Sequence, residues 1–227
     1  MYKYETHLHT SPVSRCARAS VEDSLAFYKA MGYDGVFMTN HFFDGSMSPA
    51  PDNTYEGKIN FFFSDYEYGL EIGAKLGIKV FGGVETSYKG TDFLVYGLDK
   101  AWFLAHPEIV GMERSDFLTL MRESGALIIQ AHPFHEAPYI DHIRLFPRHV
   151  HGVEIVNAGH RDEHNRMAKL YAEHYGLIPF AGSDNHVAGE QRRLAGVEFD
   201  EPIDSVEEFI AAVKSGAAKV FTLINEG

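Results

Sequence analysis

Two histidines stand two residues apart near the start of the chain, in the sequence Thr-His-Leu-His-Thr at 6–10. Residues i and i+2 of a β-strand point to the same side, so the rings of His7 and His9 are expected to project together from the end of a strand. Two imidazoles directed at one point are typical of a metal site. A chain with 13 histidines can contain this spacing by chance. The pair therefore indicates a metal site only if further candidate ligands are found.

Further candidate ligands stand where predicted strands end. They are Asn40 and His41, Glu85, His132, and Asp184 with His186. In a parallel barrel the carboxyl ends of all strands open onto one face, where barrel enzymes build their sites. Such a topology would bring these side chains together although they are far apart in the sequence.

Short apolar runs alternate with amphipathic stretches along the chain, which predicts a parallel α/β architecture in a single domain over residues 1–227. The pattern is compatible with a barrel or a doubly wound sheet. Strands are predicted at 2–7, 35–39, 78–84, 92–97, 126–130, 152–156, 177–181 and 219–224. Helices are predicted at 20–32, 64–77, 114–124, 162–175 and from Asp204 or Ser205 to 216. Residues 42–60, rich in Gly, Pro, Ser and Asn, are predicted to be a long connection without regular structure.

Composition narrows the classes of function. The 227 residues are 45% hydrophobic and 23% charged, as in folded proteins. A formal charge of -12 opposes binding to long nucleic acid. No apolar stretch approaches the roughly 20 residues of a membrane span, and the first residues lack a signal-peptide pattern, so the cytoplasm is the expected location. Cys16 is the single cysteine, so any metal is expected on histidines and carboxylates.

The order of the motifs resembles the polymerase and histidinol phosphatase (PHP) family of metal-dependent phosphoesterases. The motifs are Thr-His-Leu-His-Thr-Ser at 6–11, Thr-Asn-His at 39–41, Gly-Val-Glu at 83–85, Ala-His-Pro at 131–133, Glu-Ile-Val-Asn at 154–157 and Gly-Ser-Asp-Asn-His at 182–186. The resemblance implies a distorted TIM-like (β/α)7 barrel of parallel strands. It also implies two or three divalent metal ions at the carboxyl ends of the strands.

The resemblance further implies roles for individual residues. The metal ligands would be His7, His9, His41, Glu85, Asp92, His132, Asp184 and His186. Glu85 would bridge two ions, and the catalytic residues would be Asp184, His186 and Glu85. The chain departs from the family at three places: Asp92 replaces a histidine, Asn40 replaces an aspartate, and Arg15 with Cys16 stands where a third ion often gains a ligand.

The implied chemistry is hydrolysis by a metal-bound hydroxide. Two divalent ions roughly 3.5 to 4 Å apart can share a hydroxide and polarise a phosphoryl oxygen. Mixed nitrogen and oxygen ligands suit Zn, Mn or Fe. A phosphate ester also needs donors, and Arg15, Arg192 and His135 are the predicted substrate-binding residues because they stand near the ligand motifs.

Two weaker signals concern neighbouring residues. His160 and His164 are spaced i, i+4 and are expected to share a helix face as a surface pair outside the barrel. Glu154 and Asn157 close a strand on the functional face and are expected to orient the ligands.

Three functions agree with these residues. The first is a phosphoesterase acting on a small phosphorylated metabolite or nucleotide. The second is a metal-dependent non-phosphate hydrolase, similar to amidohydrolases. The third is a non-catalytic, metal-stabilised PHP binding module. A phosphate substrate needs arginine or lysine donors at the metal face, whereas an amide does not.

Overall fold

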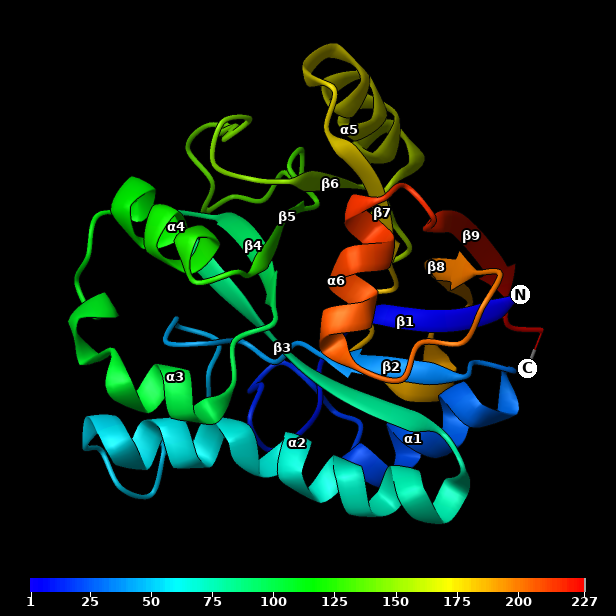
Figure 1. Cartoon of the computed structure of the whole chain (residues 1–227), viewed down its shortest axis with the longest axis horizontal. Helices are drawn as coiled ribbons and strands as arrows, with labels where there is room; N and C mark the ends of the chain where they lie inside the picture. Colours follow the sequence, from blue (N-terminus) through cyan, green and yellow to red (C-terminus); the bar gives the residue numbers. More distant parts are fainter. Residues whose placement is uncertain (227) are drawn as a thin grey trace.

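The computed structural model describes residues 1–226. The strands of this range form one curved sheet in the order β7-β6-β5-β4-β3-β2-β1-β8-β9. The sheet bends until its ends nearly meet, and helices surround it (Figure 1). The predicted α/β barrel-like fold is therefore confirmed.

The elements follow one another along the chain as an alternation of strands and helices. The strands are β1 (Tyr2–Leu8), β2 (Gly35–Met38), β3 (Lys79–Tyr88), β4 (Thr91–Tyr96), β5 (Leu127–Ala131), β6 (Gly152–Asn157), β7 (Ile178–Gly182), β8 (Arg193–Phe199) and β9 (Lys219–Ile224). The α-helices are α1 (Val21–Ala30), α2 (Tyr55–Leu76), α3 (Lys100–Ala105), α4 (Arg114–Glu123), α5 (Asp162–Tyr175) and α6 (Val206–Lys214). Short 3-10 helices occupy Pro107–Ile109 and Ala188–Glu190.

The sheet differs from an all-parallel barrel of seven strands. Strands β1, β2 and β3 run parallel, as do β5, β6 and β7, but β4 is antiparallel to both of its neighbours. Only Lys89 and Gly90 link β3 to β4, and both have positive φ, 52° and 78°. So short a link allows a hairpin and not a parallel crossover. Strands β8 and β9 add a further antiparallel pair beside β1.

The second helix begins earlier than predicted. Its N-cap is Thr54, whose hydroxyl accepts a hydrogen bond from the Gly57 amide. Ser64 lies inside the helix, so the predicted helix start at residue 64 is wrong, and only residues 42–54 form the irregular connection. The sequence also gave no indication of α3 or β8, because α3 is short and Gly196 interrupts the apolar pattern of β8.

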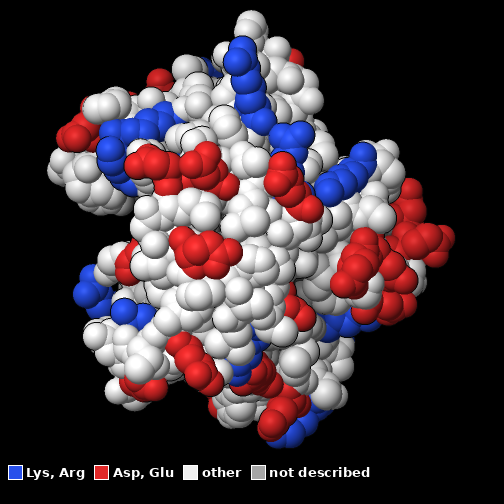
Figure 2. All heavy atoms as spheres, turned by 60° about the vertical axis from the view of Figure 1, so that its left-hand side comes forward, with Lys and Arg blue, Asp and Glu red and all other residues white. Residues whose placement is uncertain are grey.

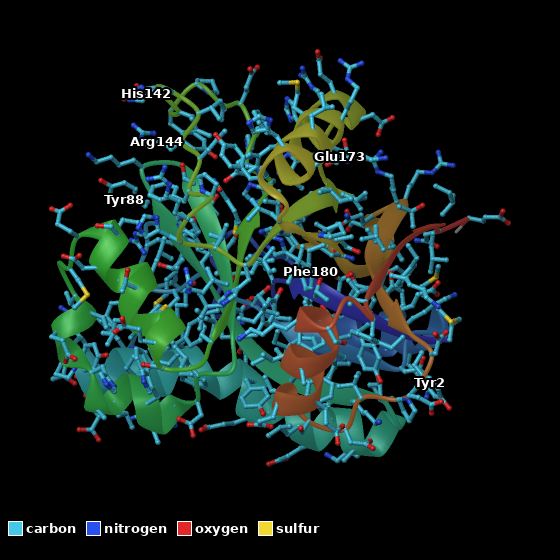
Figure 3. All side chains as sticks on the ribbon, turned by 45° about the horizontal axis from the view of Figure 1, so that its top comes forward. Tyr2, Tyr88, His142, Arg144, Glu173 and Phe180 are labelled. Atoms are coloured by element: carbon cyan, nitrogen blue, oxygen red, sulfur yellow. The ribbon has the colours of Figure 1, made fainter. Side chains whose placement is uncertain are left out.

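Aromatic side chains fill the barrel at the end covered by α6. Phe209 of α6 lies 4.1 Å from Phe37 and 5.5 Å from Tyr96, measured between ring centroids. Phe180 belongs to the same core and points into the interior in Figure 3. This packing closes the barrel at the end where the parallel strands begin.

Charged side chains of both signs are scattered among uncharged residues on the face shown in Figure 2. This mixture is unlike the clustered basic surface of nucleic-acid-binding proteins. None of the helices in residues 1–226 combines the length and the apolar composition needed to cross a membrane.

Replacing Phe209 with alanine is expected to lower the free energy of unfolding by about 3–5 kcal/mol, because the change opens a cavity in a fully buried aromatic core. Chemical denaturation would measure this loss. Leu170→Ala is the control, since Leu170 is 56% exposed on α5 and its loss should cost less than about 0.5 kcal/mol. An equal loss of stability in the two variants would contradict the conclusion that packing of α6 closes this end of the barrel.

Candidate metal centre

The ends of the parallel strands bring the predicted ligands together. His7 and His9 project from the end of β1 and are fully buried. Glu85 lies within β3, His132 follows β5, and Asp184 follows β7. Although these residues span most of the chain, their side chains form one compact cluster of imidazoles and carboxylates.

Each oxygen of Glu85 faces a different pair of histidines. Oε1 lies 3.1 Å from His7 Nε2 and 3.3 Å from His132 Nε2. Oε2 lies 3.2 Å from His9 Nε2 and 3.0 Å from His41 Nδ1. A carboxylate placed in this way can bridge two cations.

The two oxygens of Asp184 also face different histidines. Oδ1 lies 3.5 Å from His7 Nε2 and 3.4 Å from His9 Nε2. Oδ2 lies 3.7 Å from His132 Nε2 and 3.6 Å from His160 Nε2. His7 and His9 therefore face different oxygens of Glu85 but the same oxygen of Asp184.

These contacts have the spacing of ligands around a shared ion. With bonds of about 2.0–2.2 Å, two ligand atoms of a tetrahedral zinc site lie about 3.3–3.6 Å apart. His7 Nε2 and His9 Nε2 are buried and make no hydrogen bond, despite their short distances to Glu85. Two orphaned imidazole nitrogens beside two carboxylates fit a transition-metal site. We call His7, His9, Glu85 and Asp184 the inner site.

Hydrogen bonds at the other ring nitrogens select Nε2 as the ligating atom. His7 Nδ1 donates to Glu154 Oε1 over 3.0 Å. Ser14 Oγ donates its single hydrogen to Asn40 over 2.8 Å, so it accepts from His9 Nδ1 at 3.1 Å. Both tautomers therefore leave the Nε2 lone pairs facing the carboxylates, as in other histidine metal sites.

Glu154 and Asn157 contact the ligands, as the sequence predicted. Glu154 Oε2 accepts from the His132 amide at 3.0 Å and from Asn157 Nδ2 at 2.8 Å. The same Asn157 amide donates to Asp184 Oδ2 over 3.2 Å. One carboxylate thus orients ligands that come from β1, β5 and β7.

A carboxylate lies next to Asn40, although asparagine itself is neutral. Its Nδ2 donates to Asp65 Oδ2 over 3.2 Å, and Asp65 also accepts from the hydroxyl of Thr10 over 2.7 Å. Asp65 comes from α2 and is buried. The resemblance implied a carboxylate at position 40. In this chain the carboxylate is that of Asp65, which lies behind Asn40 and contacts it by a hydrogen bond.

The backbone around the ligands is held closely. Glu5 Oε1 accepts from the amides of His7 and Ser183, each at 2.8 Å, which ties β1 to the turn after β7. A Cβ atom at Gly182 would lie 2.5 Å from His7 Cβ and 2.8 Å from Glu154 Oε1, so only glycine fits there. Asp184 has a φ of 54°, the kind of backbone strain that is typical of functional sites.

Charges within the cluster oppose the effect of burial on its pKa values. Burial raises the pKa of Glu85, but His7 and His41 outweigh it and hold the pKa well below its ordinary value. Burial lowers the pKa of His7, but the charges of Asp184 and Glu154 raise it well above its ordinary value. Glu85 therefore stays ionised, and binding of a divalent cation to His7 Nε2 would release a proton from His7.

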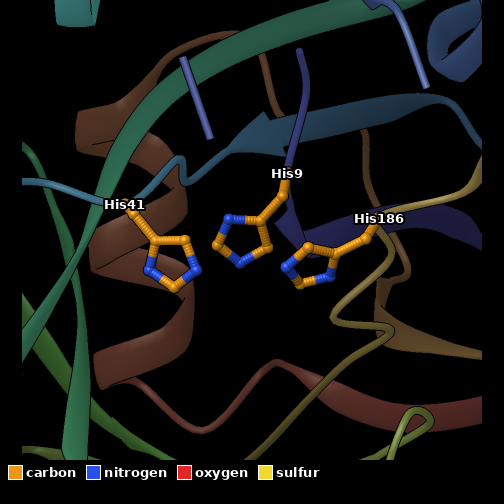
Figure 4. Close-up of side chains that lie close together, drawn as sticks. All are labelled: His9, His41 and His186. Carbon is orange, nitrogen blue, oxygen red and sulfur yellow. The ribbon is translucent and has the colours of Figure 1, made fainter. Parts of the chain in front are cut away.

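A second group of rings lies beside the inner site. The ring of His9 is 4.4 Å from that of His41 and 4.2 Å from that of His186, between centroids (Figure 4). One nitrogen of each lies within 4.8 Å of the others. Asp44, which the sequence analysis missed, contacts His41 Nδ1 at 3.2 Å. This group is the candidate position for a further ion.

Other predicted residues lie at the margin of the cluster or away from it. Asp92 Oδ2 is 3.8 Å from His132 Nε2, while its other oxygen accepts from the Ser87 hydroxyl. Asp92 reaches this end because β4 runs antiparallel. Arg15 is exposed and donates to the Gly45 carbonyl, and Arg192 is exposed at the start of β8. Within residues 1–226, neither guanidinium makes a hydrogen bond or ion pair with the cluster.

His160 is the main residue that sequence analysis misplaced. It lies in the turn between β6 and α5, with its ring 4.8 Å from that of His132. The expected surface pair with His164 is wrong for His160, because the helix begins only at Asp162. The rule that found the other ligands, a polar residue just after a parallel strand, also applies to His160.

Comparisons with known proteins agree with this picture. A family model described as PHP-associated matches residues 162–218, from α5 to the residue before β9. A comparison with curated protein sequences gave no match.

Three solved structures are similar over nearly the whole chain. A two-domain protein from Bacteroides vulgatus, containing a predicted PHP-like metal-dependent phosphoesterase, is 16% identical with a TM-score of 0.70. The match covers 97% of this chain and 64% of that protein, so the chain spans less than two thirds of its length. PsfC from Pseudomonas syringae is 15% identical, with a TM-score of 0.62 and coverage of 99% and 92%. An amidohydrolase from Chromobacterium violaceum, with bound sulfate and no metal, is 15% identical, with a TM-score of 0.53 and 98% coverage of both chains.

At these identities the similar structures establish the fold. The PHP-associated model is limited to residues 162–218, which is less than half of the chain.

Replacing Glu154 with glutamine is expected to weaken metal binding about 10- to 100-fold, because an amide cannot accept hydrogen bonds at both of its atoms and His7 loses its anionic partner. Competition with a chromophoric chelator would measure the affinity. Glu173→Gln is the control, since Glu173 lies on the outer side of α5 (Figure 3). Unchanged affinity in the Glu154 variant would show that this carboxylate does not position the ligands.

Proposed function

We propose that the chain, whose PHP-family assignment the comparisons support, hydrolyses the phosphate ester of a small metabolite or nucleotide with two or three divalent ions, Zn, Mn or Fe, as cofactors. One observation carries this proposal. Glu85 and Asp184 each present their two oxygens to different histidines at distances typical of ligands that share an ion.

Divalent ions held at this cluster supply the chemistry of a phosphoesterase, because they polarise a phosphoryl oxygen and lower the pKa of a water molecule. The chain supplies position and charge. Glu85 and Asp184 bring negative charge to the inner site, and the Nε2 atoms of His7 and His9 face them. This donor set of imidazoles and carboxylates favours Zn, Mn or Fe over Mg or Ca.

Exposure indicates the side from which a substrate approaches. The side chains of His7 and His9 are fully buried and that of Glu85 is 2% exposed, so they form the floor of the site. The side chain of His186 is 25% exposed, and it stands with Asp184 and His160 at the rim. A substrate would therefore meet Asp184 and His186 first, which supports their proposed catalytic roles.

A non-phosphate hydrolase is the second candidate. The guanidinium groups of Arg15 and Arg192 are exposed, and the structure gives neither a contact with the cluster. A substrate without a phosphate would not need such donors. The similarity to the Chromobacterium amidohydrolase also favours this alternative.

The test combines metal analysis with hydrolysis. Inductively coupled plasma mass spectrometry should find two or more divalent ions per chain, and p-nitrophenyl phosphate hydrolysis should disappear on chelation and return with Mn or Zn. His9→Ala and Asp184→Ala should lose metal and at least about 100-fold of the rate together, because several kcal/mol of charge stabilisation is lost. His174→Ala, an exposed histidine on α5, should behave as the wild type.

Metal content with cleavage of amides and no cleavage of phosphate esters would favour the second candidate. Full metal content in both His9→Ala and Asp184→Ala would overturn the ligand assignment itself.

A further inference from the structure

Two histidines outside the predicted ligand set converge on His132. The ring of His135 lies 5.6 Å from that of His132, the ring of His160 lies 4.8 Å from it, and the two are 4.3 Å from each other, between centroids. One nitrogen of each ring lies within 4.8 Å of the other two. We call these three residues the three-histidine site.

The chain holds this arrangement through its backbone. His135 belongs to a turn after β5, where its amide donates to the His132 carbonyl over 2.9 Å. The segment that carries His160 is fixed by Arg193, which donates to the carbonyls of Ala158 and His160. Arg193 in turn pairs with Asp162 at the start of α5. The backbone that carries His160 is therefore held by Arg193 of β8 and by the start of α5.

Carboxylate oxygens complete the set of donors. Asp184 Oδ2 lies 3.6 Å from His160 Nε2 and 3.7 Å from His132 Nε2, and Glu85 Oε1 lies 3.3 Å from His132 Nε2. These distances are close to the spacing of about 3.3–3.6 Å between ligands of a tetrahedral ion. They repeat the spacing seen in the inner site: Asp184 uses its opposite oxygen, and Glu85 Oε1 is shared with His7.

We infer that His132, His135 and His160, together with Asp184, bind a divalent transition-metal ion next to the inner site. Three imidazoles and a carboxylate oxygen are a donor set for zinc or iron rather than magnesium or calcium. His160 takes the part assigned to Asp92 by the resemblance, since one nitrogen of His160 lies within 4.8 Å of those of His132 and His135, whereas Asp92 belongs to no such group within residues 1–226 and its Oδ2 lies 3.8 Å from His132 Nε2. His135 then acts as a ligand, not as a substrate contact. This inference rests on the metal dependence proposed above.

The experiment counts metal ions in the full chain after complete chelation and reloading with zinc. His160→Ala and the double variant His135→Ala, His160→Ala should each lose one zinc ion per chain, or bind it at least about 10-fold more weakly, and keep the remainder. His174→Ala should retain the wild-type content. Asp92→Asn should also retain it, because Asp92 is not required in this arrangement.

His160→Cys separates a ligating role from a structural one. Cysteine binds zinc but does not resemble the imidazole ring in shape, so recovery of the lost zinc in this variant supports ligation. Circular dichroism checks that every variant is folded. Wild-type zinc content and affinity in the double variant would overturn the inference while leaving the proposed function in place. A wild-type chain that binds no metal would overturn both.

Discussion

The structure depends on two carboxylates that lie among histidines, the buried Glu85 and the largely buried Asp184. An ionised carboxylate is costly to bury unless cations or hydrogen-bond donors surround it. Glu85 and Asp184 meet this requirement with both of their oxygens, since every one of these oxygens faces imidazole nitrogens. The same arrangement that makes their burial tolerable also places nitrogen and oxygen donors at the spacing of metal ligands. Stability of this end of the barrel and affinity for cations therefore have one origin.

Residues behind the ligands make the arrangement specific. Glu154 and Ser14 fix the ring orientation of His7 and His9, and Asp65 supports Asn40 from α2. Glu5 joins the first strand to the turn that carries Asp184. The hydrogen bonds of these side chains restrict the ligands to one geometry, which is the usual task of groups that surround a metal site.

Some helices and strands could be predicted from local sequence patterns, and others could not. Helix α5 and strand β5 were predictable, because periodicity and a terminal glycine mark them in the sequence. The start of α2 was not, because Ser64 and Asp65 look like a helix cap although Asp65 is buried against Asn40 and Thr10. The direction of β4 was also missed, since parallel and antiparallel strands share the same period of two.

The strand-helix alternation and the types of ligand can be predicted from the sequence, because spacing within a strand and position at a strand end are local properties. The sequence identified His7 and His9, and it indicated that His132 and Asp184 would join them. Tertiary structure alone decided which histidine faces which carboxylate oxygen. His160 joins the cluster because Arg193 holds its turn, whereas Arg15 remains outside it. Such outcomes depend on pairwise distances between distant segments, which no local pattern encodes.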